Sequence, residues 1–197
     1  MIKPENYENT PVQGDFEKVE LGGHKMIIKQ VTETKSKNGQ DMIVVLFDFD
    51  QTDAQAGYFM KSFKDDIRPD KKWSNQATQY ILVNDNEGKT SKAFKTFCTC
   101  AEHSNAGFVI NWGDNWGEQF KNKKIGGVFG EQLDFYNGEE KKKRVLRWFV
   151  SLDKVADAAI PDVQETKAYK DNKNNTSTGV TGFMNIPDGI DEELPFN

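Results

Sequence analysis

The sequence is poor in cysteine and histidine, with two of each, and it contains no long apolar run. Cys98 and Cys100 are too close together for an easy loop-closing disulfide, and we expect both thiols to stay reduced. No segment approaches the roughly 18 to 20 apolar residues that a membrane-spanning helix needs, and residues 1–5 lack the apolar core of a signal peptide. These absences predict a cytoplasmic protein without membrane contact.

Patterns typical of metal sites and nucleophilic enzymes are also scarce. The spacing Cys98-x-Cys100-x-x-His103 falls short of the four ligands of a structural zinc site, because His24 is distant in sequence. On the helix predicted there, Cys98 faces the core and Cys100 points elsewhere. Neither histidine lies in a pattern typical of a nucleophilic triad. The sequence therefore predicts no metal and no cofactor.

One enzymatic pattern is present in residues 44–53, where an apolar strand leads into Asp-x-Asp-x-Thr. It resembles the opening motif of haloacid-dehalogenase-type phosphatases, which implies Asp48 as nucleophile and Asp50 as general acid or base beside Mg²⁺. That family usually has Gly at the position of Gln51 and an apolar residue at that of Asp53. It also needs a parallel sheet of strand–helix units, whereas this chain has one convincing helical segment. The phosphatase is kept as an alternative to a non-enzymatic protein.

Charge is divided unevenly along the chain. Residues 162–197 contain seven acidic residues and three lysines, which gives −4 of the total net charge of −5. Residues 1–161 are therefore nearly neutral. Non-specific nucleic-acid binders usually carry a basic surface, so DNA binding here requires lysines that gather on one face.

The pattern of apolar residues predicts two β-rich regions with a helix between them. Asn38-Gly39 is a strong hairpin signal, and a second hairpin surrounds a long charged loop at 137–143. In residues 91–102, Ala93, Phe94, Phe97, Cys98 and Ala101 fall on one helical face. A shorter helix is expected at 153–159. The predicted strands are 26–31, 42–47, 58–63, 125–136 and 144–152.

This element order is that of the OB-fold, a five-stranded barrel that binds oligonucleotides on its strand 2–3 face and in the loops joining strands 1–2 and 4–5. We predict a mainly β chain, with an OB-fold-like five-stranded barrel and one main helix in residues 1–161. Residues 162–197 have too few apolar side chains to offset the entropy of ordering them. They are expected to form a flexible, disordered acidic tail.

The chain ends with Asp191-Glu192-Glu193-Leu194-Pro195-Phe196-Asn197. This end resembles the C-terminal tail of bacterial and phage single-stranded DNA-binding proteins, in which acidic residues and Pro-Phe are gripped by replication and recombination partners. In this chain Asn197 follows the Phe. The resemblance implies partner binding by Asp191, Glu192, Glu193, Leu194, Pro195 and Phe196.

Binding of single strands requires cations that follow the phosphates and flat side chains on which bases stack. As a strand, residues 58–63 would place Phe59, Lys61 and Phe63 on one face. Alternation likewise predicts Trp148 in the interior and Phe149 on the opposite face, while Trp112 and Trp116 lie among Gly and Asn that can bury little. The candidate DNA-binding residues are Phe59, Lys61, Phe63, Lys64, Arg68, Lys71, Lys72, Trp73, Trp112, Trp116, Lys141, Lys142, Lys143, Arg144, Arg147 and Phe149.

Four further segments carry a resemblance over about residues 14–161: 57–59, 103–108, 124–131 and 147–151. They are similar to single-stranded DNA-binding or replication-cluster proteins of phages and mobile elements in Gram-positive bacteria. We therefore expect sequence-independent binding of single-stranded DNA in the host cytoplasm, with replication or recombination proteins recruited through the tail. A recombination mediator or adaptor with weak DNA binding stays a third alternative, and a homo-oligomer is left open.

Overall fold

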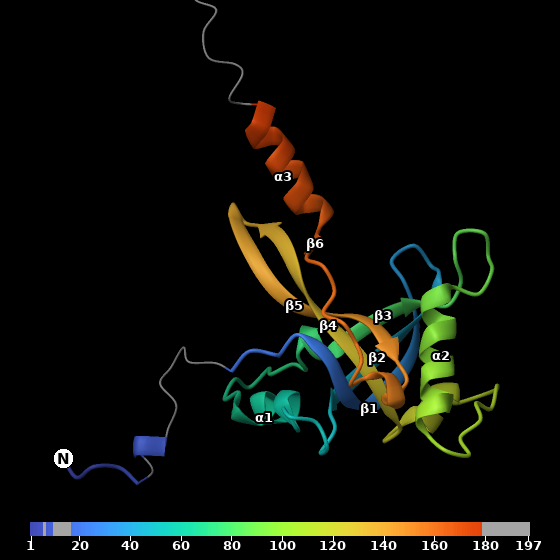
Figure 1. Cartoon of the computed structure of the whole chain (residues 1–197), viewed down its shortest axis with the longest axis horizontal. Coiled ribbons are helices and arrows are strands. Elements are labelled where there is room, and N and C mark those ends of the chain that lie inside the picture. The colour runs from blue at the N-terminus through green and yellow to red at the C-terminus, as the bar shows by residue number, and fades with distance from the viewer. Residues whose placement is uncertain (6, 10–16, 179–197) are drawn as a thin grey trace, which may run out of the picture.

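A computed structural model describes residues 1–5, 7–9 and 17–178. In this part of the chain, six strands form one sheet in the order β3-β2-β1-β4-β5, and β6 pairs in parallel with β4 while all other pairs are antiparallel (Figure 1). The strands are β1 (Gly22–Lys35), β2 (Asp41–Phe49), β3 (Thr78–Leu82), β4 (Lys124–Tyr136), β5 (Glu139–Val150) and β6 (Gln164–Glu165). The mainly β prediction is confirmed.

Three α-helices and four short 3₁₀ helices accompany the sheet in the described residues. The α-helices are α1 (Tyr58–Asp65), α2 (Lys92–Ser104) and α3 (Lys167–Thr178). The 3₁₀ helices are η1 (Tyr7–Asn9), η2 (Asn75–Ala77), η3 (Trp116–Phe120) and η4 (Leu152–Lys154). None of the helices described has the length and apolar character of a membrane span.

The main helix is confirmed as α2. Its first turn is capped by Ser91, whose Oγ accepts the N–H of Phe94 at 3.1 Å. Phe94, Phe97, Cys98 and Ala101 are buried in the core as predicted, whereas Ala93 is exposed. The shorter helix predicted at 153–159 is only the 3₁₀ turn η4.

Both hairpins form, but the second has a different turn from the one predicted. The β1–β2 hairpin turns at Asn38-Gly39 as expected, with Lys35 opposite Asp41. In the second hairpin, Asn137 and Gly138 have φ angles of 53° and 82°, and they alone connect β4 to β5. Such a pair of positive φ angles closes a two-residue turn whose twist matches the strands. The predicted loop at 137–143 was therefore wrong, and residues 141–143 lie within β5.

The strand predicted at 58–63 was also wrong, because this segment is the helix α1. Phe59 and Phe63 are four residues apart, a spacing that fits one side of a helix as well as one side of a strand. The carboxylate of Asp48 settles the choice by accepting the N–H of Phe59 at 3.0 Å in the first turn. The third strand is β3, which pairs with β2.

A β-bulge at Arg147 changes which side chains of β5 face the core. Val128 pairs with Trp148 and Phe129 pairs with Leu146, so Arg147 has no partner position on β4. One extra residue reverses the alternation beyond it. Leu146 and Phe149 are both 6% exposed, whereas Trp148 is 45% exposed. The predicted placement of Trp148 inside and Phe149 outside was wrong.

Order extends beyond residue 161, where the flexible tail was predicted to begin. The N–H of Thr166 donates to the carbonyl of Leu133 at 2.9 Å, and its hydroxyl donates to Asp134 at 2.9 Å. These bonds follow β6 and join the start of α3 to β4. Figure 1 shows α3 continuing from the far end of the β4–β5 hairpin. The predicted partner-binding residues Asp191 to Phe196 lie outside the described residues.

Within the described chain, β3 and β5 are the two outer strands of the main path and do not pair with each other. We call the gap between them the seam. Within the described residues, one hydrogen bond from η2 crosses the seam. In it, the Nε2 of Gln76 donates to the carbonyl of Arg144 on β5 at 2.9 Å. The sheet is therefore open at the seam in the described residues.

The bulge predicts losses of stability of unequal size for two neighbouring substitutions. Phe149→Ala should lower the free energy of unfolding by about 3–5 kcal/mol, because it empties a core position. Trp148→Ala should lower it by roughly half as much or less, since nearly half of this side chain is in water. Urea denaturation of the two variants checks this, and a larger loss for Trp148→Ala would contradict the bulge.

Candidate nucleic-acid interface

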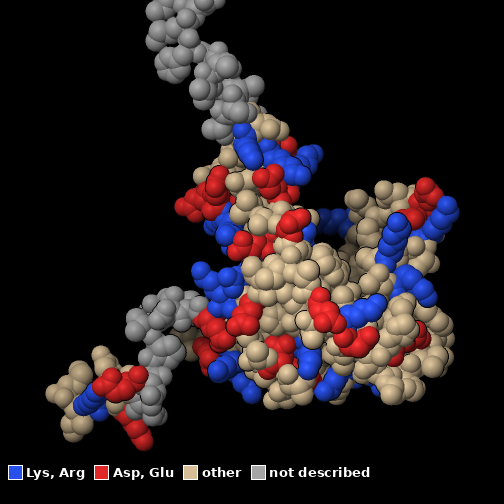
Figure 2. Space-filling view, viewed as in Figure 1, with Lys and Arg blue, Asp and Glu red and all other residues tan. Residues whose placement is uncertain are grey.

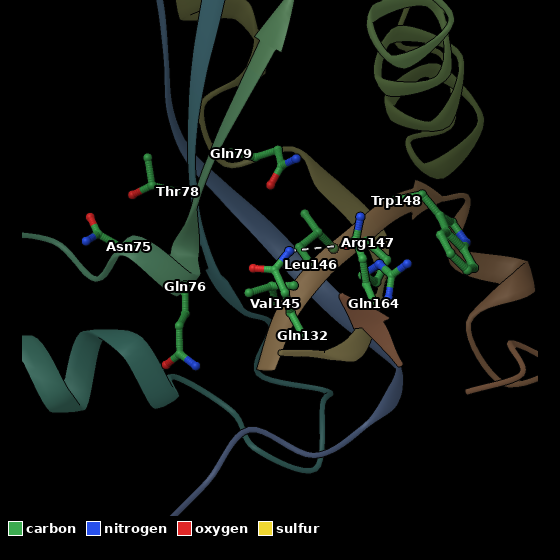
Figure 3. A pocket seen from close by; sticks show the side chains of 10 residues that line it. All are labelled: Asn75, Gln76, Thr78, Gln79, Gln132, Val145, Leu146, Arg147, Trp148 and Gln164. Carbon is green, nitrogen blue, oxygen red and sulfur yellow. Dashed lines mark hydrogen bonds between the residues drawn. The ribbon is translucent and has the colours of Figure 1, made fainter. Parts of the chain in front are cut away.

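The seam contains a polar groove of about 470 Å³. Its two walls come from η2 with β3 and from β5, and Gln132 of β4 and Gln164 of β6 complete it (Figure 3). The lining residues are Asn75, Gln76, Thr78, Gln79, Gln132, Val145, Leu146, Arg147, Trp148 and Gln164. We call this space the seam groove.

The seam groove contains both occupied and free polar side chains. Gln132 and Gln164 hydrogen-bond to each other at 3.2 Å, and the Arg147 guanidinium donates to the carbonyl of Asp162 at 3.0 Å. The side-chain amides of Asn75 and Gln79 have no hydrogen-bond partner within the described residues. These two amides are therefore available to a ligand.

A second feature lies on the face of the sheet that points away from the core. Here Leu46 pairs with Thr78, Val44 with Tyr80 and Met42 with Leu82. We call these six residues of β2 and β3 the outer strip. Tyr80 is 60% exposed at its centre. Tyr80 was missed because β3 was missed, although the apolar run in residues 80–83 is typical of a strand.

A third feature lies at the far end of the outer strip. Trp112 is 65% exposed and stacks on Trp116, with ring centroids 5.7 Å apart. Both indoles line an apolar pocket of about 270 Å³ together with Met42. Thr78 belongs to the seam groove and to the outer strip, while Met42 belongs to the outer strip and to this pocket. The three features therefore form one continuous track, along which Trp148, Tyr80 and Trp112 are the exposed aromatic residues.

Three of the predicted stacking residues are not available, because their rings are in the core. Phe59 is 1% exposed, and Trp116 and Phe149 are each 6% exposed. Trp116 packs on Phe120 and Phe94, with ring centroids 4.5 Å and 5.5 Å apart. The glycines and asparagines around Trp116 gave no sign of these neighbours, which come from η3 and α2. As stacking positions, these three predictions were wrong.

The predicted residues near α1 form a separate basic and aromatic cluster. Phe63 and Trp73 contact each other with centroids 5.7 Å apart, and the Lys71 ammonium lies 4.9 Å from the Phe63 ring. Within the described chain Lys61, Lys64 and Lys72 have no carboxylate partner, and Lys71 acts on the carboxylate of Asp66 only as a nearby charge, lowering its pKa. The chain runs from this cluster directly into η2, so the cluster borders the seam groove. These predictions stay open.

Several other predicted cations are already paired. Lys141, Lys142 and Lys143 form ion pairs with Glu139, Glu131 and Asp134 at 3.7, 2.8 and 2.7 Å. Such exposed pairs contribute about 0–1 kcal/mol, so phosphates can displace them.

Two arginines among the candidates are also engaged. Hydrogen bonds from Arg68 lower the pKa of Asp66 to about 2, and Arg144 donates to the carbonyl of Val19. Figure 2 shows Lys and Arg interspersed with Asp and Glu on the face it presents, rather than gathered in one patch.

The two aspartates of the phosphatase pattern have structural partners away from the track. Asp48 accepts the N–H groups of Phe49 and Phe59, and burial raises the pKa of Asp48 while these bonds offset part of the rise. Burial acts to raise the pKa of Asp50 too, but hydrogen bonds from Thr52 and Lys124 outweigh it and lower the pKa. The antiparallel main sheet is not the parallel sheet that such phosphatases need.

The cysteine pattern gives no convergent ligand set. Cys98 is buried, and burial raises the pKa of its thiol to about 12, so the thiolate that zinc requires is disfavoured. In the part of the chain that is described, no three His, Cys, Asp or Glu side chains gather closely enough to hold a metal ion.

A scan against models of known protein families and a search of curated proteins gave no match.

Asp48 offers a test that separates a structural carboxylate from a nucleophile. Its raised pKa means that the folded protein binds the proton more tightly than the unfolded chain does, so ionisation costs stability as pH rises above the ordinary value of 3.8. Asp48→Asn keeps the acceptor oxygen without the charge, and should leave the free energy of unfolding at pH 7 equal or higher. Asp48→Ala should lower it by about 1–3 kcal/mol, because the N–H of Phe59 loses its acceptor.

Thermal unfolding of both variants at pH 7 checks this expectation. If Asp48→Asn were as destabilised as Asp48→Ala, the charge itself would be required. Loss of a Mg²⁺-dependent phosphomonoesterase activity in Asp48→Asn would support the phosphatase instead.

Proposed function

We propose that this protein binds single-stranded DNA along the track, with bases stacked on exposed aromatic side chains. The observation that carries the proposal is the continuity of the seam groove, the outer strip and the Trp112 pocket through shared residues. Base–aromatic stacking contributes roughly 1–3 kcal/mol per base, so three exposed rings supply useful affinity without a large basic patch. The single strand would run beside β3.

The topology supports this proposal. The order β3-β2-β1-β4-β5 becomes that of an OB-fold barrel if the seam is closed, and α2 lies between β3 and β4 in the chain as the helix of that fold does. OB-folds bind oligonucleotides on the face of strands 2 and 3. The outer strip occupies this face. We therefore propose an OB-type barrel that is open at the seam.

The charges support binding of moderate strength. Lys71 and Lys72 precede η2 in the chain by three to four residues, and neither forms an ion pair within the described residues, so they are the cations that phosphates would meet at this end of the track. Elsewhere cations and acids are mixed. This mixture favours affinity that depends on stacking, and it is compatible with a recombination mediator that binds DNA weakly. Stimulation of strand annealing without tight DNA binding would favour that mediator.

Partner recruitment belongs to the same proposal. It rests on the resemblance of residues 191–196 to the acidic tails of single-stranded DNA-binding proteins. Deletion of residues 188–197 should abolish recruitment of a replication or recombination partner and leave DNA affinity equal or tighter. Weaker DNA binding by the truncated protein would contradict this separation of roles.

Tyr80 is the position at which stacking is tested most directly. Tyr80→Ala should weaken binding of an oligo-dT of about 30 nucleotides roughly 5- to 150-fold, which corresponds to the loss of one stacked base. Tyr136→Ala is the matched control, because Tyr136 is also 60% exposed but lies at the β4–β5 turn. Fluorescence titration with a duplex competitor measures both, and equal losses in the two variants would argue against the track.

The cluster near α1 is tested by salt dependence. Replacing Lys71 and Lys72 by Gln should reduce the slope of log affinity against log salt concentration by roughly 0.7 for each lysine that contacts a phosphate. Lys89→Gln is the control, because Lys89 pairs with Glu87 in the β3–α2 connection. An unchanged slope in the double variant would show that the strand does not pass this cluster.

A further inference from the structure

We infer that the seam groove holds one nucleobase and reads its edge, so that the protein distinguishes among single-stranded sequences. This inference rests on the proposed function and adds to it, because stacking and phosphate contacts alone are tolerant of sequence. The groove is rich in side-chain amides, which binding without sequence preference does not need.

Side-chain amides dominate the lining of the groove. Five of the ten lining residues are Asn or Gln, the lining contains no carboxylate, and Arg147 is its one charged member. Each amide offers both hydrogen-bond donors and an acceptor, which is also the pattern on the edges of the bases. A groove built for phosphates would instead be lined by cations.

Some of the amide side chains in the groove form hydrogen bonds within the protein, and others are free. Gln76, Gln132 and Gln164 are engaged with one another or with the backbone, and they fix the walls. Gln79 and Asn75 have no partner in the described chain. Figure 3 shows Gln79 from β3 on one side of the groove and Trp148 from β5 on the other. Asn75 lies on the other side of β3 in this view. A base that stacks on the exposed face of Trp148 therefore enters a space that contains the free amide of Gln79.

The size and the position of the groove agree with this occupant. A volume of about 470 Å³ lies within the usual range of roughly 300–1,000 Å³ for small-ligand sites. The groove joins the outer strip at Thr78, so a strand stacked on Tyr80 can place a neighbouring base in it. A polypeptide strand added between β3 and β5 would pair with backbone groups and would need neither the amide side chains nor the indole.

The experiment compares the affinities of the full chain for dA, dT and dC oligonucleotides of about 15 nucleotides. The wild-type protein should prefer one of them over the least favoured by about 5- to 150-fold, the range for one bidentate contact. Gln79→Leu keeps the size of the side chain but not its hydrogen bonds, and it should bring the three affinities together. Asn75→Ala removes the free amide on the other side of β3 and should leave the discrimination in place, and Gln51→Leu, an exposed position outside the groove, should change nothing.

The outcomes separate this inference from the function on which it rests. Equal wild-type affinities for the three oligonucleotides would overturn base reading and leave single-strand binding in place. Unchanged discrimination in correctly folded Gln79→Leu would also overturn it, and is the result expected if a polypeptide occupies the seam. No binding to any oligonucleotide would remove the proposed function itself.

Discussion

The β-bulge at Arg147 is the constraint on which the candidate site depends. In a regular strand, Trp148 would follow Leu146 into the core and Phe149 would face solvent. One unpaired residue reverses this, so Phe149 packs on Phe97 with centroids 5.3 Å apart while Trp148 is turned outward. The same bulge lies in the edge strand at the seam. It supplies the track with an aromatic ring, and a bulge of this kind bends the strand that contains it.

An open seam leaves two strand edges that a protein must manage, because unpaired backbone groups attract other strands. Here β3 is only five residues long, and Gln76 spans the gap to β5 with a side-chain hydrogen bond. Polar amides then line the space between the edges. This arrangement protects the edges and at the same time creates a groove in which a ligand meets side chains rather than backbone.

Much of the fold could be predicted, because some signals are local. The first hairpin was located by Asn38-Gly39, where Gly39 has a positive φ angle, and the second was located by its two flanking apolar strands. The repeat of Phe94, Phe97, Cys98 and Ala101 identifies α2 in the same way. The prediction for residues 58–65 was wrong because the spacing of the two phenylalanines suits both a helix and a strand. The carboxylate that favours the helix, that of Asp48, lies ten residues before the first helical position.

The candidate site was predicted less well than the fold, for a physical reason. Whether an aromatic ring is in the core or in solvent depends on neighbours distant in sequence, as for Trp116 against Phe94, and residue type alone does not reveal them. The lysines at 141–143 were predicted to form a DNA-binding loop. The strand register instead pairs two of them with Glu131 and Asp134. The seam groove is formed by four segments that are separate in the sequence, so no single sequence motif predicts it.

The sequence by itself determined the first turn, the main helix, the β-rich character and the concentration of negative charge after residue 161, because each follows from local backbone preference or from composition. Only the tertiary structure decided which aromatic residues are exposed, which cations are paired and which amides are free. Those properties depend on strand register, and a single bulged residue is enough to exchange the two faces of a strand.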